Sequence, residues 1–326
     1  MIGPTVTIRP AVPGLSDVID VVRRHTGVSG KQAISTVASY IDTSDPLHGP
    51  GDDGAVVELE GARVVVCGEA IAPSFVRGDG YGAGVASVLA NVNDVAAMGG
   101  VPKAIVNTVI GRDADVAEVL RGMCDAAKMY DVPIVGGHLT RDDADTSLSA
   151  FALGQVRVPL SMANVRPGQA VMFAACLDGT MRTDFPFFTS IAERASTLAR
   201  DVRLLSRLAE TGLAVAAKDV SMAGSLGSLA MLLEFTRHGA HVNMDLMPCP
   251  ADTDPLRYLI SFPTYGFWLT SPKESAADCT QVFEEHGLFC AQVGVVNEST
   301  RLTLTSGEDE ELLMDFATES VTGLWA

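Results

Sequence analysis

The stretch GDGYGAGVASVLANVNDVAAMGGVPK, residues 78–103, organises the rest of the chain. Apolar residues recur in it at the spacing of one helical face: Val85, Val88, Leu89, Val92 and Ala96. This period predicts a helix over residues 82–98. The opposite face holds Ser87, Asn91 and Asp94, where a helix facing water normally carries Lys and Glu. The pattern therefore predicts a helix that is buried on both sides.

Asp94 is the only charged residue between Asp79 and Lys103. A buried, ionised carboxylate without a partner costs several kcal/mol or takes up a proton. Asp94 therefore implies a bound cation, a network of donors or a shifted pKa. A polar residue satisfied at a helix end is the structural alternative, and both interpretations stay open at this point.

Composition limits the possible partners. The chain has 326 residues, enough for two cores, and its 40 acidic and 23 basic residues give a net charge of −17. This charge repels nucleic acid and anionic membranes, so we expect neither as a partner. An acidic protein can still bind a polyphosphate when divalent cations lie between its carboxylates and the phosphate oxygens.

Targeting and cysteine signals point to the cytoplasm. The first residues lack a charged segment followed by an apolar core, and no run reaches about 18 apolar residues, so we expect a cytoplasmic protein. The six cysteines form no CxxC pair, which favours reduced core thiols over disulfides or zinc. Cys67, two residues before Glu69, is more simply a strand residue than a nucleophile.

The first half of the chain alternates polar turns with strands. Residues 15–41 predict one or two amphipathic helices, and the segment GDDGAVVEL, residues 51–59, is a turn that leads into a strand. Asp52 and Asp53 suit simple turn chemistry. A second strand over residues 64–67 precedes Glu69, and a turn and a strand end in one sheet can present their carboxylates to one point.

A strand over residues 104–110 follows, then a helix that Asp113 caps and that runs to about Tyr130. The segment DVPIVGGHLT, residues 131–140, predicts a buried strand that ends in Gly136, Gly137 and His138. A polar residue at such a strand end is typical of a ligand site in an α/β protein. A structural histidine is the alternative. A strand over residues 148–156 completes a first α/β domain.

The second half begins after a boundary near residue 160, because the Arg-Pro-Gly turn at residues 166–168 leads into a strand to Ala175. Helices are expected near residues 187–211, 223–238 and 273–286, and strands near 240–245, 265–270 and 290–296. In AAKDVSMAGSLGSL, residues 216–229, Asp219 and Ser221 precede a helix whose first N–H groups can hold an anion. Capping by Ser221 is the alternative. We predict two domains, 1–160 and 161–326.

Five segments occur in an order that resembles the AIR synthetase-like ATP-binding superfamily: GDDGAVV, NVNDVAAMGGVP, VGGHLT, RPGQAV and KDVSMAGSLGSL. That superfamily includes thiamine-monophosphate kinase, selenophosphate synthetase and a hydrogenase-maturation factor. The resemblance covers residues 15 to about 300. It implies an α/β protein of the α+β type with two domains, the first forming a dimeric sheet or barrel and the second an α/β domain.

The resemblance also implies a homodimer that binds ATP and Mg²⁺ between its domains and acts on a small-molecule substrate. Carried over by position, Asp94 and Asp219 are the implied catalytic residues. The implied metal ligands are Asp53, Glu69, Asp94 and Asp219. The implied nucleotide-binding residues are Asp52, Asn91, Gly136, Gly137, His138 and Ser221. Hard oxygen ligands of this kind bind Mg²⁺, which neutralises charge that develops during phosphoryl transfer.

The chain departs from the kinase-like pattern at several positions. It has Glu69, His138 and Met222 where those relatives have Asp, and Met222 is no ligand for a hard cation. Their acidic substrate motif is replaced by SFPTYGFWL, residues 261–269. This replacement suggests an aromatic substrate contact or a loss of activity. The candidate contacts are Tyr265, Phe267 and Trp268.

Three hypotheses follow for the function. The first is an ATP-dependent kinase or synthetase that activates a small molecule by phosphoryl transfer, with catalysis by positioning and charge neutralisation. The second is a non-catalytic nucleotide-binding subunit of a larger assembly. The third is a metalloenzyme of other chemistry, in which Glu69 and His138 recruit a transition metal.

Overall fold

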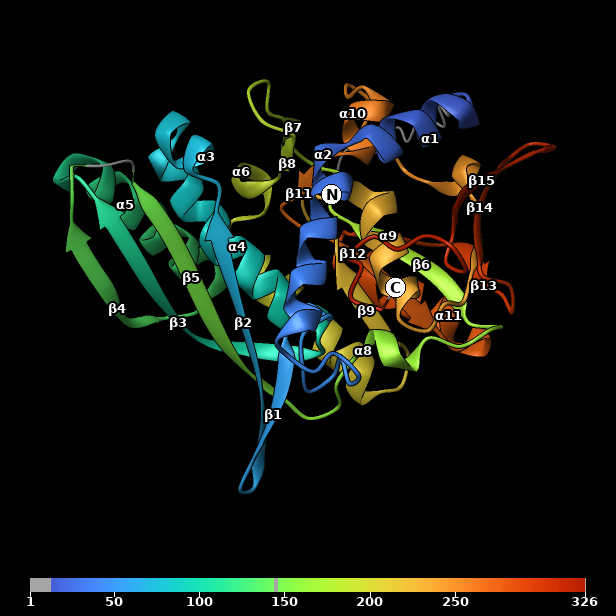
Figure 1. Ribbon diagram of the computed structural model, residues 1–326, viewed down its shortest axis with the longest axis horizontal. Coiled ribbons are helices and arrows are strands. Elements are labelled where there is room, and N and C mark those ends of the chain that lie inside the picture. Colours follow the sequence, from blue (N-terminus) through green and yellow to red (C-terminus); the bar gives the residue numbers. More distant parts are fainter. Residues whose placement is uncertain (1–12, 144–145, 326) are drawn as a thin grey trace. The chain divides into compact units, whose positions relative to one another are not determined.

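The computed structural model describes residues 13–143 and 146–325, and this part of the chain divides into two compact units (Figure 1). The five-stranded unit holds residues 53–159 and 194–207. The seven-stranded unit holds the rest of the described chain: residues 13–52, 160–193 and 208–325. The chain thus enters each unit more than once. The two continuous domains expected from the sequence, residues 1–160 and 161–326, remain a prediction.

The five-stranded unit is built on one sheet with the strand order β1-β2-β5-β3-β4. Neighbouring strands are antiparallel except β3 and β4, which are parallel. The strands are β1 (Ala55–Leu59), β2 (Ala62–Ile71), β3 (Gly100–Gly111), β4 (Ile134–Arg141) and β5 (Ser147–Val156). The parallel pair is joined through a helix, as parallel neighbours require.

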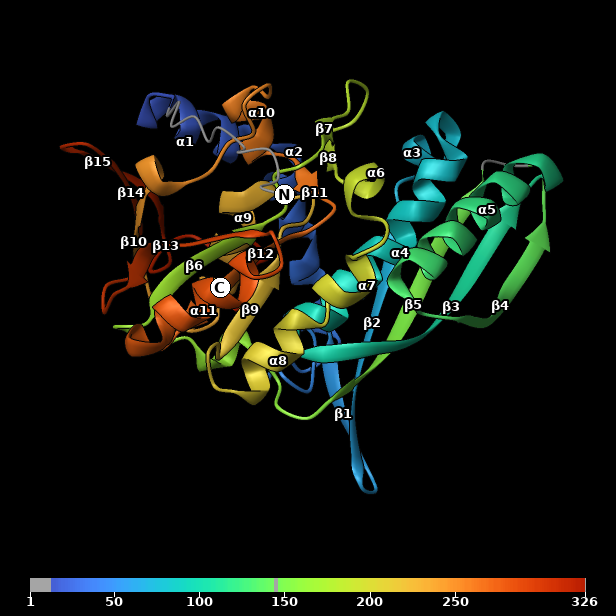
Figure 2. The same cartoon turned by 180° about the vertical axis from the view of Figure 1, so that it is seen from behind.

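The helices α4 (Gly80–Ala97) and α5 (Asp113–Tyr130) lie on one face of this sheet (Figures 1 and 2). The helix α4 begins where the Asp79 carboxylate accepts a hydrogen bond from the backbone N–H of Gly82, at 2.7 Å. Glycine lets the two helices approach closely: a Cβ on Gly84 would lie 2.1 Å from the carbonyl oxygen of Val119. The short helices α3 (Pro73–Gly78) and α7 (Leu198–Asp201) complete the unit.

The central helix predicted from the sequence is confirmed, and so is its burial. The structure starts it two residues earlier than predicted and ends it one residue earlier. Its polar residues are buried as well as its apolar ones: Ser87 and Asn91 have no exposed surface and Asp94 is 6% exposed. Two flanking helices, α3 and α5, and three strands of the sheet surround α4.

Two local predictions in this unit are wrong. The segment expected to be a buried strand is β4, an edge strand whose side chains are mostly exposed, because only β3 pairs with it. Its apolar side chains Val135 and Leu139 are 62% and 59% exposed. Asp113 is the first residue of α5 rather than its cap, and Arg112 precedes it without a capping side chain.

The second face of the five-stranded sheet carries apolar side chains that no helix among the described residues of this unit covers (Figures 1 and 2). We call this surface the open face. Its side chains are 38% to 44% exposed, and strand register places them together: Val66, Val106, Ile110, Phe151 and Leu153. Contiguous apolar patches of this kind mark interaction surfaces.

The seven-stranded unit is built on a mixed sheet with the order β15-β14-β10-β13-β6-β12-β9 and on a small sheet with the order β11-β8-β7. The large sheet consists of β6 (Ala170–Ala175), β9 (Ala216–Asp219), β10 (Ala240–Asn243), β12 (Gly266–Ser271), β13 (Phe289–Val296), β14 (Arg301–Ser306) and β15 (Asp309–Asp315). The small sheet consists of β7 (Thr180–Met181), β8 (Phe187–Thr189) and β11 (Phe262–Pro263).

Helices of this unit pack on its sheets around an apolar core. The α-helices are α1 (Leu15–Arg24), α2 (Thr26–Ser29), α9 (Gly224–Glu234), α10 (Pro255–Leu259) and α11 (Ala276–Glu284). The 3₁₀ helices are η1 (Gly30–Ser39), η2 (Met162–Asn164), η3 (Met244–Leu246) and η4 (Lys273–Ser275). Two more helices cross the limits of the units: α6 (Ile191–Arg194) and α8 (Leu204–Glu210). In the core, the rings of Phe173 and Trp268 lie 4.8 Å apart.

The sequence predictions for this unit hold in part. The amphipathic segment 15–41 becomes α1 and α2 followed by the 3₁₀ helix η1. The single helix expected near residues 187–211 is wrong, because residues 187–189 form β8 and three short helices follow. The predicted strands near 240–245, 265–270 and 290–296 correspond to β10, β12 and β13. In the described residues, every helix is too short or too polar to cross a membrane.

Candidate functional site

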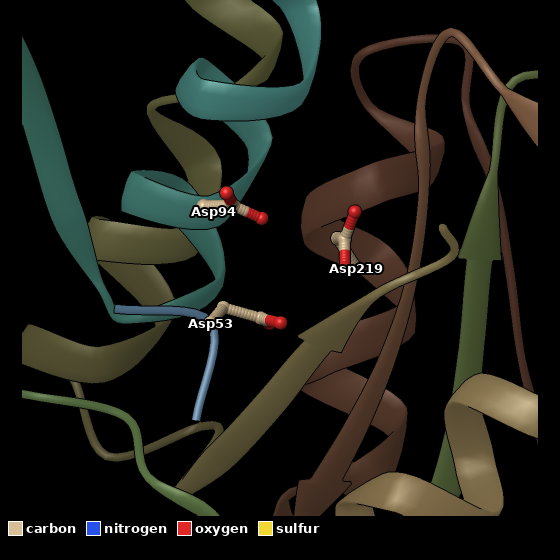
Figure 3. A group of neighbouring side chains, drawn as sticks. All are labelled: Asp53, Asp94 and Asp219. Carbon is tan, nitrogen blue, oxygen red and sulfur yellow. The ribbon is translucent and has the colours of Figure 1, made fainter. Parts of the chain in front are cut away.

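Asp94 lies on the buried helix α4 and is 6% exposed. Asp53 lies in the turn before β1 and is half-buried. Carboxylate oxygens of the two residues lie within 4.8 Å of each other, and Figure 3 shows both side chains extending in the same direction. Like charges so close repel, and a divalent cation between them removes the repulsion. The two carboxylates therefore suit a hard cation such as Mg²⁺.

The strand β2 adds two more side chains on the helix-covered face. Cys67 and Glu69 alternate with exposed residues of the strand, so both point towards that face. The Cys67 thiol donates to Oδ1 of Asn91 at 3.5 Å. Burial, together with the charges of Asp94, Glu69 and Asp53, raises the pKa of the Cys67 thiol well above its usual value. Cys67 is thus a neutral thiol at neutral pH, and Glu69 lies on the same face of the strand two residues further on.

Asn91 has a structural contact at the position where we predicted nucleotide binding. Its side-chain amide donates to the carbonyl oxygens of Ser87, at 2.8 Å, and of Ala150, at 3.2 Å. These bonds tie α4 to β5 three residues before Asp94. Asn91 therefore holds the helix that carries Asp94, and its role towards a nucleotide stays a prediction.

Gly136, Gly137 and His138 lie on the edge strand β4. Strand register places Glu69, Ala150 and Gly137 in one row across the sheet, with side-chain positions on the helix-covered face. His138 belongs to the next row, whose side chains are on the open face. The structure thus sets Glu69 and His138 on opposite faces of one sheet. Gly137 is needed for packing, because a Cβ there would lie 2.2 Å from Oδ1 of Asn107.

Asp52 belongs to the seven-stranded unit and contacts the start of the 3₁₀ helix η2, whose capping residue is Ser161. Its Oδ2 accepts hydrogen bonds from the Ser161 hydroxyl, at 3.0 Å, and from the Met162 backbone N–H, at 2.8 Å. This carboxylate fixes the chain beside Asp53, which is the next residue. Both contacts reach residues far away in sequence, so they go beyond the simple turn chemistry considered for Asp52.

Asp219, the third residue labelled in Figure 3, is the last residue of β9 and is 4% exposed. The turn that follows leads into α9, whose capping position is Ala223, without a side-chain cap. The alternative role of Ser221 as the helix cap is therefore wrong. The Ser221 backbone N–H donates to the Ser228 hydroxyl at 3.2 Å. Gly224 starts the helix with φ +70°, a value that favours glycine.

Met222, in the same turn, is 41% exposed, and its carbonyl oxygen lies 2.8 Å from Nε2 of His25. A Cβ on Gly27 would clash with that carbonyl, so the start of the described chain packs closely on the turn. The turn between β9 and α9 is thus held in place by residues that are far away in sequence.

The expected aromatic substrate contacts are wrong. Tyr265, Phe267 and Trp268 are at most 1% exposed and form part of the core. The Trp268 indole N–H donates to the Ser225 carbonyl oxygen at 2.6 Å, and Tyr265 packs edge-on against Phe267. Trp268 packs beneath α9, whereas Phe267, the next residue of the strand, points to the opposite face of the sheet.

Lys218 is a charged residue that sequence reasoning missed. It precedes Asp219 on β9 and is 3% exposed, with its Nζ 3.8 Å from Oδ1 of Asp219. The signal was a lysine in the otherwise apolar run AVAA that leads to Asp219. Lysine is seldom fully buried unless its ammonium group is paired, so a lysine at the end of an apolar strand indicates a partner.

Family models match both halves of the chain. The AIR synthase related protein N-terminal domain matches residues 51–156, and the C-terminal domain of the same family matches residues 188–307. The chain belongs to the AIR synthase related protein family. The superfamily resemblance seen in the sequence motifs is thereby confirmed, and so is the α/β fold class.

Two relatives in sequence illustrate the range of this family. An uncharacterised protein of Synechocystis sp. is 33% identical over 317 residues, which cover 95% of this chain and 98% of the relative. A thiamine-monophosphate kinase of Rhodopirellula baltica is 29% identical over 216 residues, which cover 61% of this chain and 65% of the kinase. The family thus includes relatives that are named as kinases.

Among solved structures, T. maritima PurL complexed with ADP has a TM-score of 0.75 at 21% identity. The similarity covers 93% of this chain and 51% of the PurL chain, so the chain spans about half of that protein. At this identity the likeness shows the fold. In that structure the PurL protein is complexed with ADP.

Proposed function

We propose that the protein binds ATP together with Mg²⁺ and transfers the γ-phosphoryl group to an oxygen or amide of a small molecule. The observation that carries the proposal is the close pair of carboxylates, Asp53 and Asp94, one of them on a buried helix. A protein of net charge −17 with such a pair repels a triphosphate unless cations intervene. The kinase among the relatives and the ADP bound to PurL support this reaction class.

In this proposal Asp53 and Asp94 hold Mg²⁺ from the five-stranded unit, and Asp219 joins them from the seven-stranded unit. Glu69 supplies a further oxygen near the pair. A Mg²⁺ ion held by these residues would supply positive charge that neutralises the negative charge developing on the phosphate oxygens. The chain itself would position the nucleotide, because Asp52 and Asn91 hold the segments that carry the ligands.

The open face suits a homodimer. Its apolar side chains come from three strands, and their partly exposed surface exceeds what a sheet with a solvated face needs. We propose that two chains pair through this face. His138 lies on that face and would then lie at or beside the interface of the dimer.

A non-catalytic nucleotide-binding subunit is the second candidate. Met222 favours it, because a thioether stands in the turn after Asp219 where the kinase-like pattern has a carboxylate. In that case the protein binds Mg–ATP and releases no ADP. The third hypothesis, a transition-metal site of Glu69 and His138, lacks support within one chain, since the two residues lie on opposite faces of the sheet.

Thermal unfolding with ligands tests the proposal. A ligand that binds only the folded protein raises its stability with its concentration relative to Kd. ATP with Mg²⁺ should raise the melting temperature, while AMP with Mg²⁺ should have a smaller effect and ATP in EDTA little. ADP release in the presence of small-molecule phosphoryl acceptors then separates an enzyme from a binding subunit. No stabilisation by Mg–ATP at millimolar concentration would refute both.

A further inference from the structure

Lys218 and Asp219 form a buried ion pair in the seven-stranded unit. The Lys218 Nζ lies 3.8 Å from Oδ1 of Asp219, and their side chains are 4% and 6% exposed. An ammonium group removed from water costs several kcal/mol unless an opposite charge or hydrogen bonds compensate. The Asp219 carboxylate therefore offsets part of the free-energy cost of burying the Lys218 ammonium group.

The surroundings of the pair strengthen the interaction. The strand β9 is an edge strand, and β12 is its neighbour in the sheet. On β12, Trp268 stands opposite Lys218 and Phe267 opposite Asp219, and both aromatic side chains have no exposed surface. Two charges beside large apolar side chains are screened less by water than the same charges on a surface. Each charge therefore strongly affects any further ion at this place.

We propose that Lys218 is a built-in counter-ion of Asp219, a positioning residue that makes the site select a metal–nucleotide complex over the free metal ion. This inference rests on the proposed function, in which Asp219 is a Mg²⁺ ligand. In the metal-free protein the ammonium group compensates a buried carboxylate. A free divalent cation at Asp219 must bind beside that positive charge, which weakens it. A metal ion that arrives on a triphosphate brings negative charge with it, and Lys218 attracts that charge.

Two affinities should therefore change in opposite directions when the charge is removed. The variant Lys218→Met keeps a long apolar side chain without the ammonium group. We expect it to bind free Mg²⁺ about tenfold more tightly than the unchanged protein and Mg–ATP more weakly. Damage to the fold alone would weaken both. Lys218→Arg, which keeps the charge, should stay close to the unchanged protein in both affinities.

Calorimetric titration of the full chain with MgCl₂ alone, and with ATP in excess MgCl₂, makes this test. Lys128→Met is the matched control, because the Lys128 side chain is 77% exposed and lies on α5 of the other unit. If Lys218→Met does not fold, Lys218→Gln replaces it, since its amide carries no charge. Tighter binding of free Mg²⁺ together with weaker binding of Mg–ATP by the neutral variant, with both affinities unchanged in Lys128→Met, supports the inference, and tighter or unchanged binding of Mg–ATP by the neutral variant contradicts the selectivity.

Several outcomes would overturn it. Free Mg²⁺ bound equally well or more weakly by the neutral variant, or bound by neither protein, removes the counter-ion role. The proposed function survives these results as long as the unchanged protein binds Mg–ATP. Failure of the unchanged protein to bind Mg–ATP refutes the proposed function, and the inference about Lys218 with it.

Discussion

The substitution Asp94→Asn separates a metal-binding carboxylate from a structural one. It keeps the shape of the side chain and removes one negative charge from the close pair with Asp53. If Asp94 holds Mg²⁺, the variant should bind Mg–ATP at least about tenfold more weakly, a loss of about 1.4 kcal/mol. The metal-free protein should be as stable as before or more stable.

The size of the stability change follows from the distance. Two unit charges 4.8 Å apart repel by about 3.5 kcal/mol at an effective dielectric constant of 20, and a shorter distance raises this energy. Because Asp53 is only half-buried, water reduces this energy, and we expect a gain of about 0–2 kcal/mol in the metal-free variant. A structural Asp94 predicts the opposite sign, a loss of about 1–3 kcal/mol from disrupted hydrogen bonds.

Two measurements on each protein decide between these cases: urea denaturation without ligand and an ATP titration with Mg²⁺. Asp79→Ala is the matched control, because Asp79 caps the same helix through Gly82. It should lower the free energy of unfolding by about 1 kcal/mol and leave Mg–ATP affinity nearly unchanged. An Asp94→Asn variant that is less stable but binds Mg–ATP normally would refute the metal role of Asp94.

Three further changes test the remaining structure. Val106→Glu places a charge on the open face and should convert the dimer into a monomer, as measured by light scattering. The control Val158→Glu, at a loop site that is 44% exposed, should leave the dimer intact. A monomeric unchanged protein would contradict the proposed dimer. Gly122→Ala should lower the free energy of unfolding by about 2 kcal/mol or more, because its Cβ would lie 2.0 Å from the Tyr81 carbonyl oxygen. The control Gly136→Ala, whose Cβ meets nothing within 4 Å, should lower it by less than about 1 kcal/mol in the same denaturation assay. Burial raises the pKa of Glu234, so its contribution to stability is complete below the pKa of Glu in the unfolded chain and falls as pH rises through the raised pKa. Denaturation between pH 4 and 8 should therefore show the unchanged protein losing stability relative to Glu234→Gln. An equal pH dependence of the free energy of unfolding in the two proteins would contradict this.

Some parts of the fold could be predicted because several sequence signals agree. The helix α4 has an apolar period, glycines at close contacts and a polar face without solvating charges, so its burial follows from the residues alone. The exposure of the strand β4 could not be predicted in the same way. An apolar run such as that of Val135 and Leu139 reads as buried, while the sheet order that leaves β4 at an edge is set by distant pairing.

The candidate site shows the same division. Asp94 could be singled out because a lone charge in an apolar helix needs a reason, and Asp53 because its turn and the strand end at Glu69 can present carboxylates to one point. The faces of Glu69 and His138 could not be predicted, since they depend on the register between strands of one sheet. The burial of Trp268 depends on α9 covering it, and the segment SFPTYGFWL alone does not show that cover.

Binding of ATP with and without a divalent cation tests the central claim most directly. We predict that calorimetry of the full chain detects ATP binding in Mg²⁺ and little or none in EDTA, because the carboxylates of Asp53 and Asp94 need a cation between them and the triphosphate. Equal affinity for ATP in the two buffers would contradict the account.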